Sequence, residues 1–219
     1  MGIDKNRKYF FNQHFFDTID SEDKSYWLGF VIADGSVRLS RLRGDLRIAV
    51  HRKDANHLEK FKYIIQYDGK LYKHPTDNCS TISLYSRILS GSLIKIGVIP
   101  NKTGKEFLPV IDSLLINHLI RGVFDGDVTI GCYNNSWALS FCSCSNKLLL
   151  EIKSIINNAL GINKGSINNL KNRNAYRLKF EGNRLAPLVG DFLYKNSNIY
   201  LDRKYEKYKE MVGMNYGIK

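Results

Sequence analysis

Two short segments of the chain resemble each other, and this internal repeat constrains the possible fold more than any other feature. Residues 27–35 read WLGFVIADG, and residues 120–128 read IRGVFDGDV. Each segment is mostly apolar and has a glycine five residues before an aspartate, and the two aspartates, Asp34 and Asp127, are 93 residues apart. A repeat at such a distance indicates two related structural units in one chain.

A second pair of segments supports this division. Residues 58–65 (LEKFKYII) resemble residues 149–156 (LLEIKSII), with an offset of 91 residues. A small insertion or deletion reconciles this offset with the first one. We therefore expect an N-terminal half over residues 1–97, a linker over 98–109 that contains the turn-forming Pro100, and a C-terminal half over 110–219.

The hydrophobic patterns predict the same order of elements in both halves: helix, two strands, helix, two strands, helix. Ser21 and Asp54 suit the N-caps of the first two helices. In the first half we expect helices over 21–33, 54–67 and 87–96, and strands over 35–41, 45–52, 70–74 and 80–85. In the second half we expect helices over 110–126, 146–160 and 183–194, strands over 128–133, 137–143, 163–170 and 175–181, and a final charged helix over 202–211. Short turns between the strands favour antiparallel pairing, so the predicted fold class is α+β, with two antiparallel sheets each backed by helices on one face.

Small residues predict that the two repeated helices pack against each other. Gly29 and Ala33 are four residues apart, as are Gly122 and Gly126, so each pair lies on one helix face. Small side chains there allow two backbones to approach closely. Such packing brings Asp34 and Asp127 side by side at the helix C-termini, where the helix dipoles are already negative. Two carboxylates in that field repel each other unless a bound cation compensates their charge.

Residues 27–35 and 120–128 resemble the LAGLIDADG motif of homing endonucleases. Members with two copies in one chain consist of two pseudo-symmetric αββαββα halves, with the motif helices at the centre and the sheets forming a DNA-binding saddle. The resemblance implies a monomeric, site-specific double-stranded DNA endonuclease that cuts a long pseudo-palindromic site, leaves short 3′ overhangs and serves intron homing. It also implies that the carbonyl groups of Ala33 and Gly126 assist Asp34 and Asp127 in binding the metal.

Hard oxygen ligands of this kind suit Mg²⁺, and Mn²⁺ or Ca²⁺ can substitute for it. A metal ion between Asp34 and Asp127 can activate water and stabilise the leaving 3′ oxygen during phosphodiester hydrolysis. Two positions depart from the motif: Ile32 stands where many members carry an acid or polar residue, although this position varies in the family, and Val128 stands where the first copy has Gly35. Because valine resists the positive φ that glycine accepts, we expect Val128 to shift the Asp127 carboxylate or to weaken the second half.

Two lysines match the basic residues that the family carries after the last helix of each half. They are Lys102 and Lys204, and their expected role is to orient water or to offset charge in the transition state. Arg52, at the end of a predicted strand, is a further candidate for this role. Lys105 and Arg203 lie close by in sequence and are the obvious alternatives to the two lysines.

Basic and aromatic residues cluster in the predicted strands. Residues 164–179 hold five basic residues and no acid. Arginine reads guanine and asparagine reads adenine in the major groove, although every second strand residue must face the helices instead. The residues expected to bind DNA are Arg38, Arg41, Arg43, Arg47, Arg52, Lys70, Tyr72, His74, Tyr85, Tyr133, Asn135, Trp137, Asn168, Lys171, Arg173, Tyr176 and Lys179.

The composition agrees with a polyanionic partner. The formal net charge is +12, from 33 basic and 21 acidic residues. The four cysteines form no C-x-x-C pair and are expected to be small buried thiols. The N-terminal residues lack the apolar stretch of a secretory signal. We expect an intracellular protein with no membrane partner, in an organellar matrix or in the cytoplasm of a bacterium or phage host.

Two alternatives remain open at this point. The nearer one is a relative with weak or no nuclease activity, which acts as an intron RNA maturase or as a DNA-binding regulator; Val128 favours it. The other is a protein that binds only RNA or an anionic membrane surface, and such a protein has no need of two paired aspartates.

Overall fold

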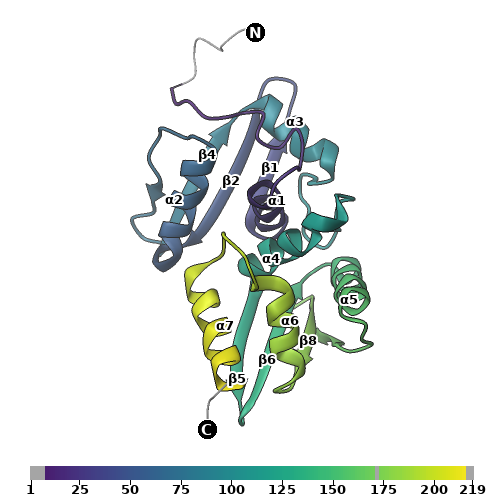
Figure 1. Ribbon diagram of the computed structural model, residues 1–219. Coiled ribbons are helices and arrows are strands. Elements are labelled where there is room, and N and C mark those ends of the chain that lie inside the picture. Colours follow the sequence, from purple (N-terminus) through teal and green to yellow (C-terminus); the bar gives the residue numbers. More distant parts are fainter. Residues whose placement is uncertain (1–7, 171–172, 216–219) are drawn as a thin grey trace.

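The computed structural model describes residues 8–170 and 173–215, and Figure 1 shows two halves that meet along a pair of central helices. These helices are α1 (Glu22–Asp34) and α4 (Ile116–Asp127). Each of them leads directly into the first strand of a four-stranded antiparallel sheet. The structure therefore confirms the predicted α+β class.

The first half is built on the sheet order β1-β2-β4-β3. Its elements after α1 are β1 (Gly35–Leu39), β2 (Gly44–His51), the short 3-10 turn η1 (Arg52–Asp54), α2 (Ala55–Ile64), β3 (Tyr72–Lys73), β4 (Cys79–Tyr85) and α3 (Arg87–Ile96). Ser21 caps α1 because its side chain accepts a hydrogen bond from the amide of Lys24. Asp54 is the N-cap residue of α2, as predicted, but its side chain makes no capping hydrogen bond.

The second half repeats this arrangement with the order β5-β6-β8-β7. Its elements after α4 are β5 (Val128–Tyr133), β6 (Ser136–Ser143), α5 (Asn146–Leu160), β7 (Ser166–Leu170), β8 (Ala175–Glu181), α6 (Leu185–Tyr194) and α7 (Asp202–Asn215). The helix predicted from residue 110 begins later, because Asp112 caps a separate 3-10 turn, η2 (Ser113–Leu115), before α4.

Alternating burial along the strands separates two faces of each sheet. In β2 the side chains of Leu46, Ile48 and Val50 are buried against the helices, whereas Arg47 and His51 are exposed on the opposite face. Antiparallel pairing keeps directly opposite residues on the same face. Arg47 therefore shares its exposed face with Ser36 on β1 and Ser83 on β4.

Within the described residues, no helix combines the length and apolar character that crossing a membrane requires. All four cysteines are free, and none is fully buried: Cys132 is exposed, and Cys79, Cys142 and Cys144 are partly exposed. The expectation of small buried thiols is therefore wrong: Cys79 and Cys142 lie on the open faces of their sheets, and Cys132 is exposed near the end of β5.

Candidate active site

Helices α1 and α4 are in backbone contact. A Cβ atom on Gly29 would lie 2.0 Å from the carbonyl oxygen of Leu119, and one on Gly122 would lie 1.9 Å from that of Tyr26. One turn further on, a Cβ atom on Gly126 would lie 2.3 Å from the methyl group of Ala33. The small residues at these positions therefore let the two helices run together to their C-terminal ends.

This packing brings two carboxylates together. The Gly126 Cβ position lies 3.5 Å from a carboxylate oxygen of Asp34, the last residue of α1, and Asp127 is the last residue of α4. Burial raises the pKa of Asp34 to about 6, and the negative charge of Asp127 adds to this shift. Removal from water also raises the pKa of Asp127. Both acids thus occupy a place where their charged forms are disfavoured.

Two lysines lie beside the acids. Lys102 Nζ donates a hydrogen bond of 2.8 Å to the carbonyl oxygen of Ala33. Lys204 is 2% exposed, and its Nζ donates 2.8 Å bonds to the carbonyl oxygens of Phe124 and Asp125. Both lysines lower the pKa of the two aspartates, although less than burial raises it. Burial in turn lowers the pKa of Lys204 to about 8, and the pKa of Lys102 is also lowered.

A cavity of about 230 Å³ adjoins Asp34. Its polar walls include His51 and Arg203, and the side chain of Arg203 is held there by Asp54, whose carboxylate oxygens lie 2.9 and 3.0 Å from Arg203 Nε. Sequence reasoning had treated Arg203 only as a possible confusion with Lys204 and had not assigned a role to His51. Arg52 is exposed, and its Nη2 donates to the carbonyl oxygen of His74.

The donor set at the helix ends fits a hard divalent cation. The acids that end α1 and α4 lie close together, backbone carbonyl groups adjoin them, and their partly buried surroundings disfavour the charged carboxylates, which a bound cation would stabilise. Among residues 8–170 and 173–215, no group of three or more His, Cys, Asp or Glu side chains could hold a metal ion by itself. The remaining ligands of a cation at Asp34 and Asp127 would therefore come from carbonyl groups, water or substrate.

A further buried carboxylate belongs to the motif of the second half. Asp125 is 1% exposed and accepts hydrogen bonds from Tyr26, Tyr194 and the backbone of Leu201. Sequence reasoning missed it. The available signal was an acid at an otherwise apolar stretch of the motif, where the first copy carries Ile32.

The face of the first sheet that points away from the helices carries many of the residues expected to bind DNA. Arg38 and Tyr85 flank Asp45 in one cross-strand row, and Arg47 lies in the next row, where it contacts His74. Tyr72 is opposite Thr81 on the same face. The remaining expected residues of this half, Arg41, Arg43, Arg52 and Lys70, are exposed in the connections between strands or beside them.

The second sheet places only part of its expected residues on that face. Asn168 pairs with the exposed Arg177, Lys179 pairs with Ser140, and Tyr133 is 60% exposed at the end of β5. Asn135 and Arg173 are exposed in turns, and Lys171 lies outside the described residues.

Two expected DNA contacts are corrected by the structure. Trp137 is 5% exposed and belongs to the hydrophobic core. Tyr176 packs against the core as well, on the same side of β8 as Leu178 and Phe180. Because successive side chains of a strand point to opposite faces, both residues lie on the face that the helices cover.

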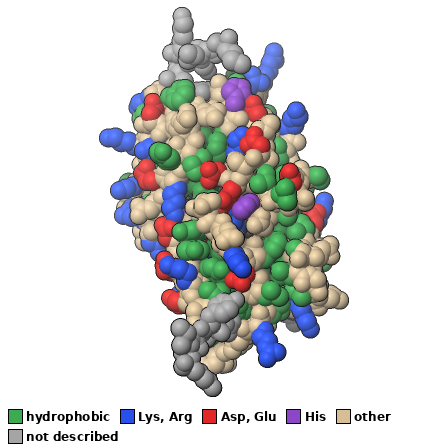
Figure 2. Space-filling view, viewed as in Figure 1, with side chains coloured by type: hydrophobic (Ala, Val, Ile, Leu, Met, Phe, Trp, Pro, Cys, Tyr) green, Lys and Arg blue, Asp and Glu red, His purple; other side chains and the backbone are tan. Residues whose placement is uncertain are grey.

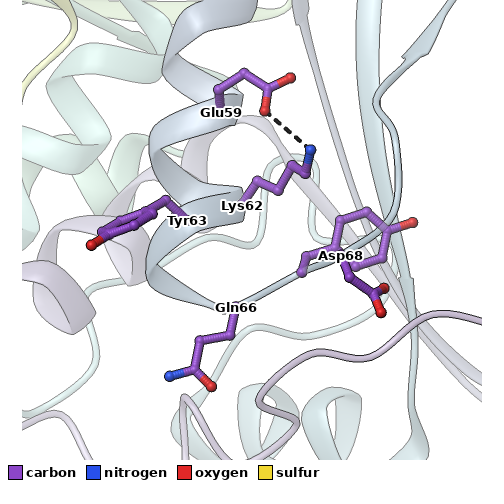
Figure 3. Close-up of a pocket in the computed structure, with 6 residues that line it drawn as sticks. Glu59, Lys62, Tyr63, Gln66 and Asp68 are labelled. Atoms are coloured by element: carbon purple, nitrogen blue, oxygen red, sulfur yellow. Dashed lines mark ion pairs between the residues drawn. The ribbon is translucent and has the colours of Figure 1, made fainter.

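The helical face is mixed in character. Figure 2, seen from the direction of Figure 1, shows acidic, basic and hydrophobic side chains interspersed on this surface. Figure 3 shows residues that line a pocket at the end of α2, where Glu59 and Lys62 pair with each other. No catalytic arrangement follows from these side chains.

No protein-family model and no curated protein matches this sequence. Solved structures do match the fold over nearly the whole chain. The homing endonuclease I-LtrWI bound to target DNA is 13% identical, with a TM-score of 0.54 and coverage of 94% of this chain and 92% of its own.

Two further structures agree. The LAGLIDADG meganuclease I-AabMI bound to uncleaved DNA is 14% identical, with a TM-score of 0.59 and coverage of 87% and 89%. I-SmaMI bound to uncleaved DNA in the presence of calcium ions is 13% identical, with a TM-score of 0.60 and coverage of 90% and 92%. A single chain of each spans both halves, so this protein has the fold of the single-chain LAGLIDADG homing endonucleases.

Proposed function

We propose that the protein is a site-specific endonuclease that hydrolyses double-stranded DNA with the help of a divalent metal ion. The observation that carries this proposal is the meeting of Asp34 and Asp127 at the abutting ends of α1 and α4, between the two sheets. Two partly desolvated carboxylates with raised pKa values are unfavourable for stability and are typical of a catalytic metal site.

Asp34 and Asp127 would hold the metal, with the carbonyl groups of Ala33 and Gly126 as further oxygen ligands. Mg²⁺ is the proposed ion, and Mn²⁺ or Ca²⁺ can occupy the same oxygen site. When bound, such an ion makes water a better nucleophile and stabilises the charge of the leaving oxygen. The complex of I-SmaMI with calcium concerns an enzyme of the same fold.

Lys102 and Lys204 would supply positive charge next to the acids. A pKa of about 8 leaves Lys204 mostly protonated at neutral pH. Because burial removes competing water, a fixed ammonium group there stabilises a negatively charged phosphate more strongly than a surface lysine does. The same two lysines hold backbone carbonyl groups next to the aspartates, which fixes the geometry of the helix ends.

The exposed sheet faces would bind the DNA. Arg38, Arg47 and Tyr85 of the first sheet, and Asn168 and Lys179 of the second, are spread along two related surfaces. Because the halves are similar but carry different side chains, the proposed target is long and imperfectly palindromic. One chain with both halves suffices for such a site, so we propose a monomer that leaves short 3′ overhangs and serves intron homing.

The direct test is a cleavage selection from a randomised duplex library with Mg²⁺, followed by the variants Asp34→Asn and Asp127→Asn on the selected site. We expect the wild-type protein to cut both strands, and each variant to lose cleavage while it binds the duplex about as tightly. A wild-type protein that binds a preferred duplex without cutting it, with any of Mg²⁺, Mn²⁺ or Ca²⁺, contradicts the proposal.

That contrary outcome supports the second candidate, a maturase for intron RNA or a DNA-binding regulator. Val128 is the observation that favours it, since the first half has Gly35 at this place. The backbone conformation at Gly35 weakens this argument. Gly35 has a φ of −77°, which valine also adopts, and β5 begins at Val128 as β1 begins at Gly35.

A further inference from the structure

We infer that Asp125 is a positioning residue for Lys204, and that it supports the cleavage of one DNA strand more than the other. This inference rests on the proposed nuclease function. It concerns a buried carboxylate whose two oxygens both accept hydrogen bonds from protein donors, and it follows from a ring of hydrogen bonds that, among the described residues, has no counterpart in the first half.

The side chain of Asp125 is fully engaged. Oδ1 accepts a bond of 2.6 Å from the Tyr194 hydroxyl, and Oδ2 accepts bonds of 2.7 Å from the Tyr26 hydroxyl and 2.8 Å from the Leu201 amide. The carboxylate is 1% exposed, so none of these donors can be replaced by bulk water without a large cost. Asp125 therefore ties α1, α6 and the start of α7 to one point of α4.

Further hydrogen bonds link the Asp125 side chain to Lys204 and link Lys204 back to the backbone of Asp125. The amide of Lys204 donates a 2.9 Å bond to the carbonyl oxygen of Leu201, whose own amide is held by Asp125. The Nζ of Lys204 then returns to the carbonyl oxygens of Phe124 and Asp125 at 2.8 Å. The chain from the Asp125 carboxylate through Leu201 to Lys204 is thus a closed ring that holds the ammonium group beside the acid pair.

The first half lacks this ring. The position that corresponds to Asp125 is Ile32, which cannot hold a backbone amide. Lys102 arrives from the segment between α3 and α4 and donates to the carbonyl oxygen of Ala33. A change at Asp125 therefore disturbs one of the two lysines. Since Lys102 follows the first half, Lys204 belongs to the second half, and a duplex has two scissile phosphates, such a change should slow one strand more than the other.

The fold around Asp125 has independent support, so a variant at this position remains testable. Arg121 is fully buried and donates to the carbonyl oxygens of Leu193 and Ile199. Glu22 accepts bonds from the backbone amides of Asn198 and Ile199. The segment before α7 thus stays attached to α1 and α4 when the bond between Asp125 and Leu201 is lost.

The experiment measures single-turnover cleavage of a duplex whose two strands carry different end labels. We expect Asp125→Asn to slow one strand between about 10- and 100-fold more than the other and to accumulate nicked duplex, because a small displacement of a catalytic group has effects of this size. Tyr208→Phe is the matched control: it removes another tyrosine–aspartate hydrogen bond, to Asp191, between α6 and α7. The control should leave the ratio of the two strand rates unchanged.

A second readout does not depend on cleavage. Lys204 should be protected from an amine-acylating reagent in the wild-type protein and should react several-fold faster in Asp125→Asn, whereas the reactivity of Lys102 should be unchanged. If the wild-type protein cuts no DNA, the proposed function fails, but the labelling still tests the ring. Equal slowing of both strands, or unchanged reactivity of Lys204, overturns the inference. Should Asp125→Asn fail to fold, Tyr194→Phe removes one donor to the carboxylate and should give the same bias in a smaller degree.

Discussion

Gly122 lies so close to Tyr26 that a Cβ atom on the glycine would stand 1.9 Å from the tyrosine carbonyl oxygen. The reciprocal contact joins Gly29 to Leu119 on the neighbouring turn. At such a distance the two helix axes cannot move apart or slide without losing most of their contact. The relative position of Asp34 and Asp127 therefore depends on Gly29 and Gly122, which lie one to two helical turns before them and have no side chain to hold the helices apart.

Gly122→Ala should destabilise the protein by about 3 kcal/mol, because the added methyl group forces the helices apart at the centre of the core. Urea denaturation measures the loss in the free energy of unfolding. Gly91→Ala in α3 is the control, since nothing lies within 4 Å of a Cβ atom there. Alanine favours a helix over glycine, so this control should be neutral or slightly stabilising. Equal effects of the two substitutions would contradict the backbone contact.

The stability of the metal-free protein should depend on the ionisation of Asp34. The folded pKa of about 6 lies above the ordinary value of 3.8. The stabilising contribution of the protonated acid is therefore present below pH 4 and is lost as the pH rises towards 6 and beyond. Relative to wild type, Asp34→Asn should gain up to about 3 kcal/mol between pH 4 and pH 7.5 in the presence of EDTA.

Asp20→Asn provides the comparison for this pH series. A hydrogen bond from Lys24 lowers the pKa of Asp20, so its contribution has the opposite sign and is lost as the pH falls. Unfolding curves at several pH values measure both differences. The same trend in both variants would show that Asp34 is not destabilised by its surroundings.

Lys102→Ala should reduce the cleavage rate by about 100-fold or more and leave DNA affinity within a few-fold, since its ammonium group stabilises charge that develops during the reaction. Single-turnover rates and binding measured in Ca²⁺ separate the two effects. Lys105, three residues further on, is exposed, and Lys105→Ala should change the rate by less than about threefold. A larger loss at Lys105 would reverse the assignment.

Arg47→Ala should weaken binding of the preferred duplex by about 1–3 kcal/mol if Arg47 reads a base edge. If it contacts a phosphate instead, binding to all duplexes should weaken and the salt dependence should fall by about one counterion. Lys62→Ala is the control, because Lys62 pairs with Glu59 on α2, on the helical side of the same sheet (Figure 3). An equal loss from both variants would place the DNA elsewhere.

Much of the fold could be predicted because its signals are local. The helix α3 was expected over 87–96 and α5 over 146–160, and both have these bounds, since caps and apolar periodicity act within a few residues. The strand β3 was expected over five residues but spans only Tyr72–Lys73, because pairing with β4 ends where the chain turns away. Helix α4 begins later than predicted because Asp112 caps the separate turn η2, and hydrophobic periodicity does not reveal such a cap.

The residues of the candidate site were likewise predicted only in part. The two aspartates and the glycines were visible because the motif occurs twice. Trp137 and Tyr176 were misplaced because the alternation of a strand tells which residues share a face but not which face is buried. That decision belongs to the helices that cover the sheet.

The sequence by itself determined the two-fold repeat, the types of its elements and the two acids at the ends of matching helices, since each depends on neighbours within a few positions. Only the tertiary structure decided that Lys102 reaches Ala33 and that Asp125 holds Leu201. Lys102 lies 69 positions from Ala33 in the sequence, and Asp125 lies 76 positions from Leu201. Their partners are set by how α1 and α4 pack and by the paths of two connecting segments, and no local pattern records either of these.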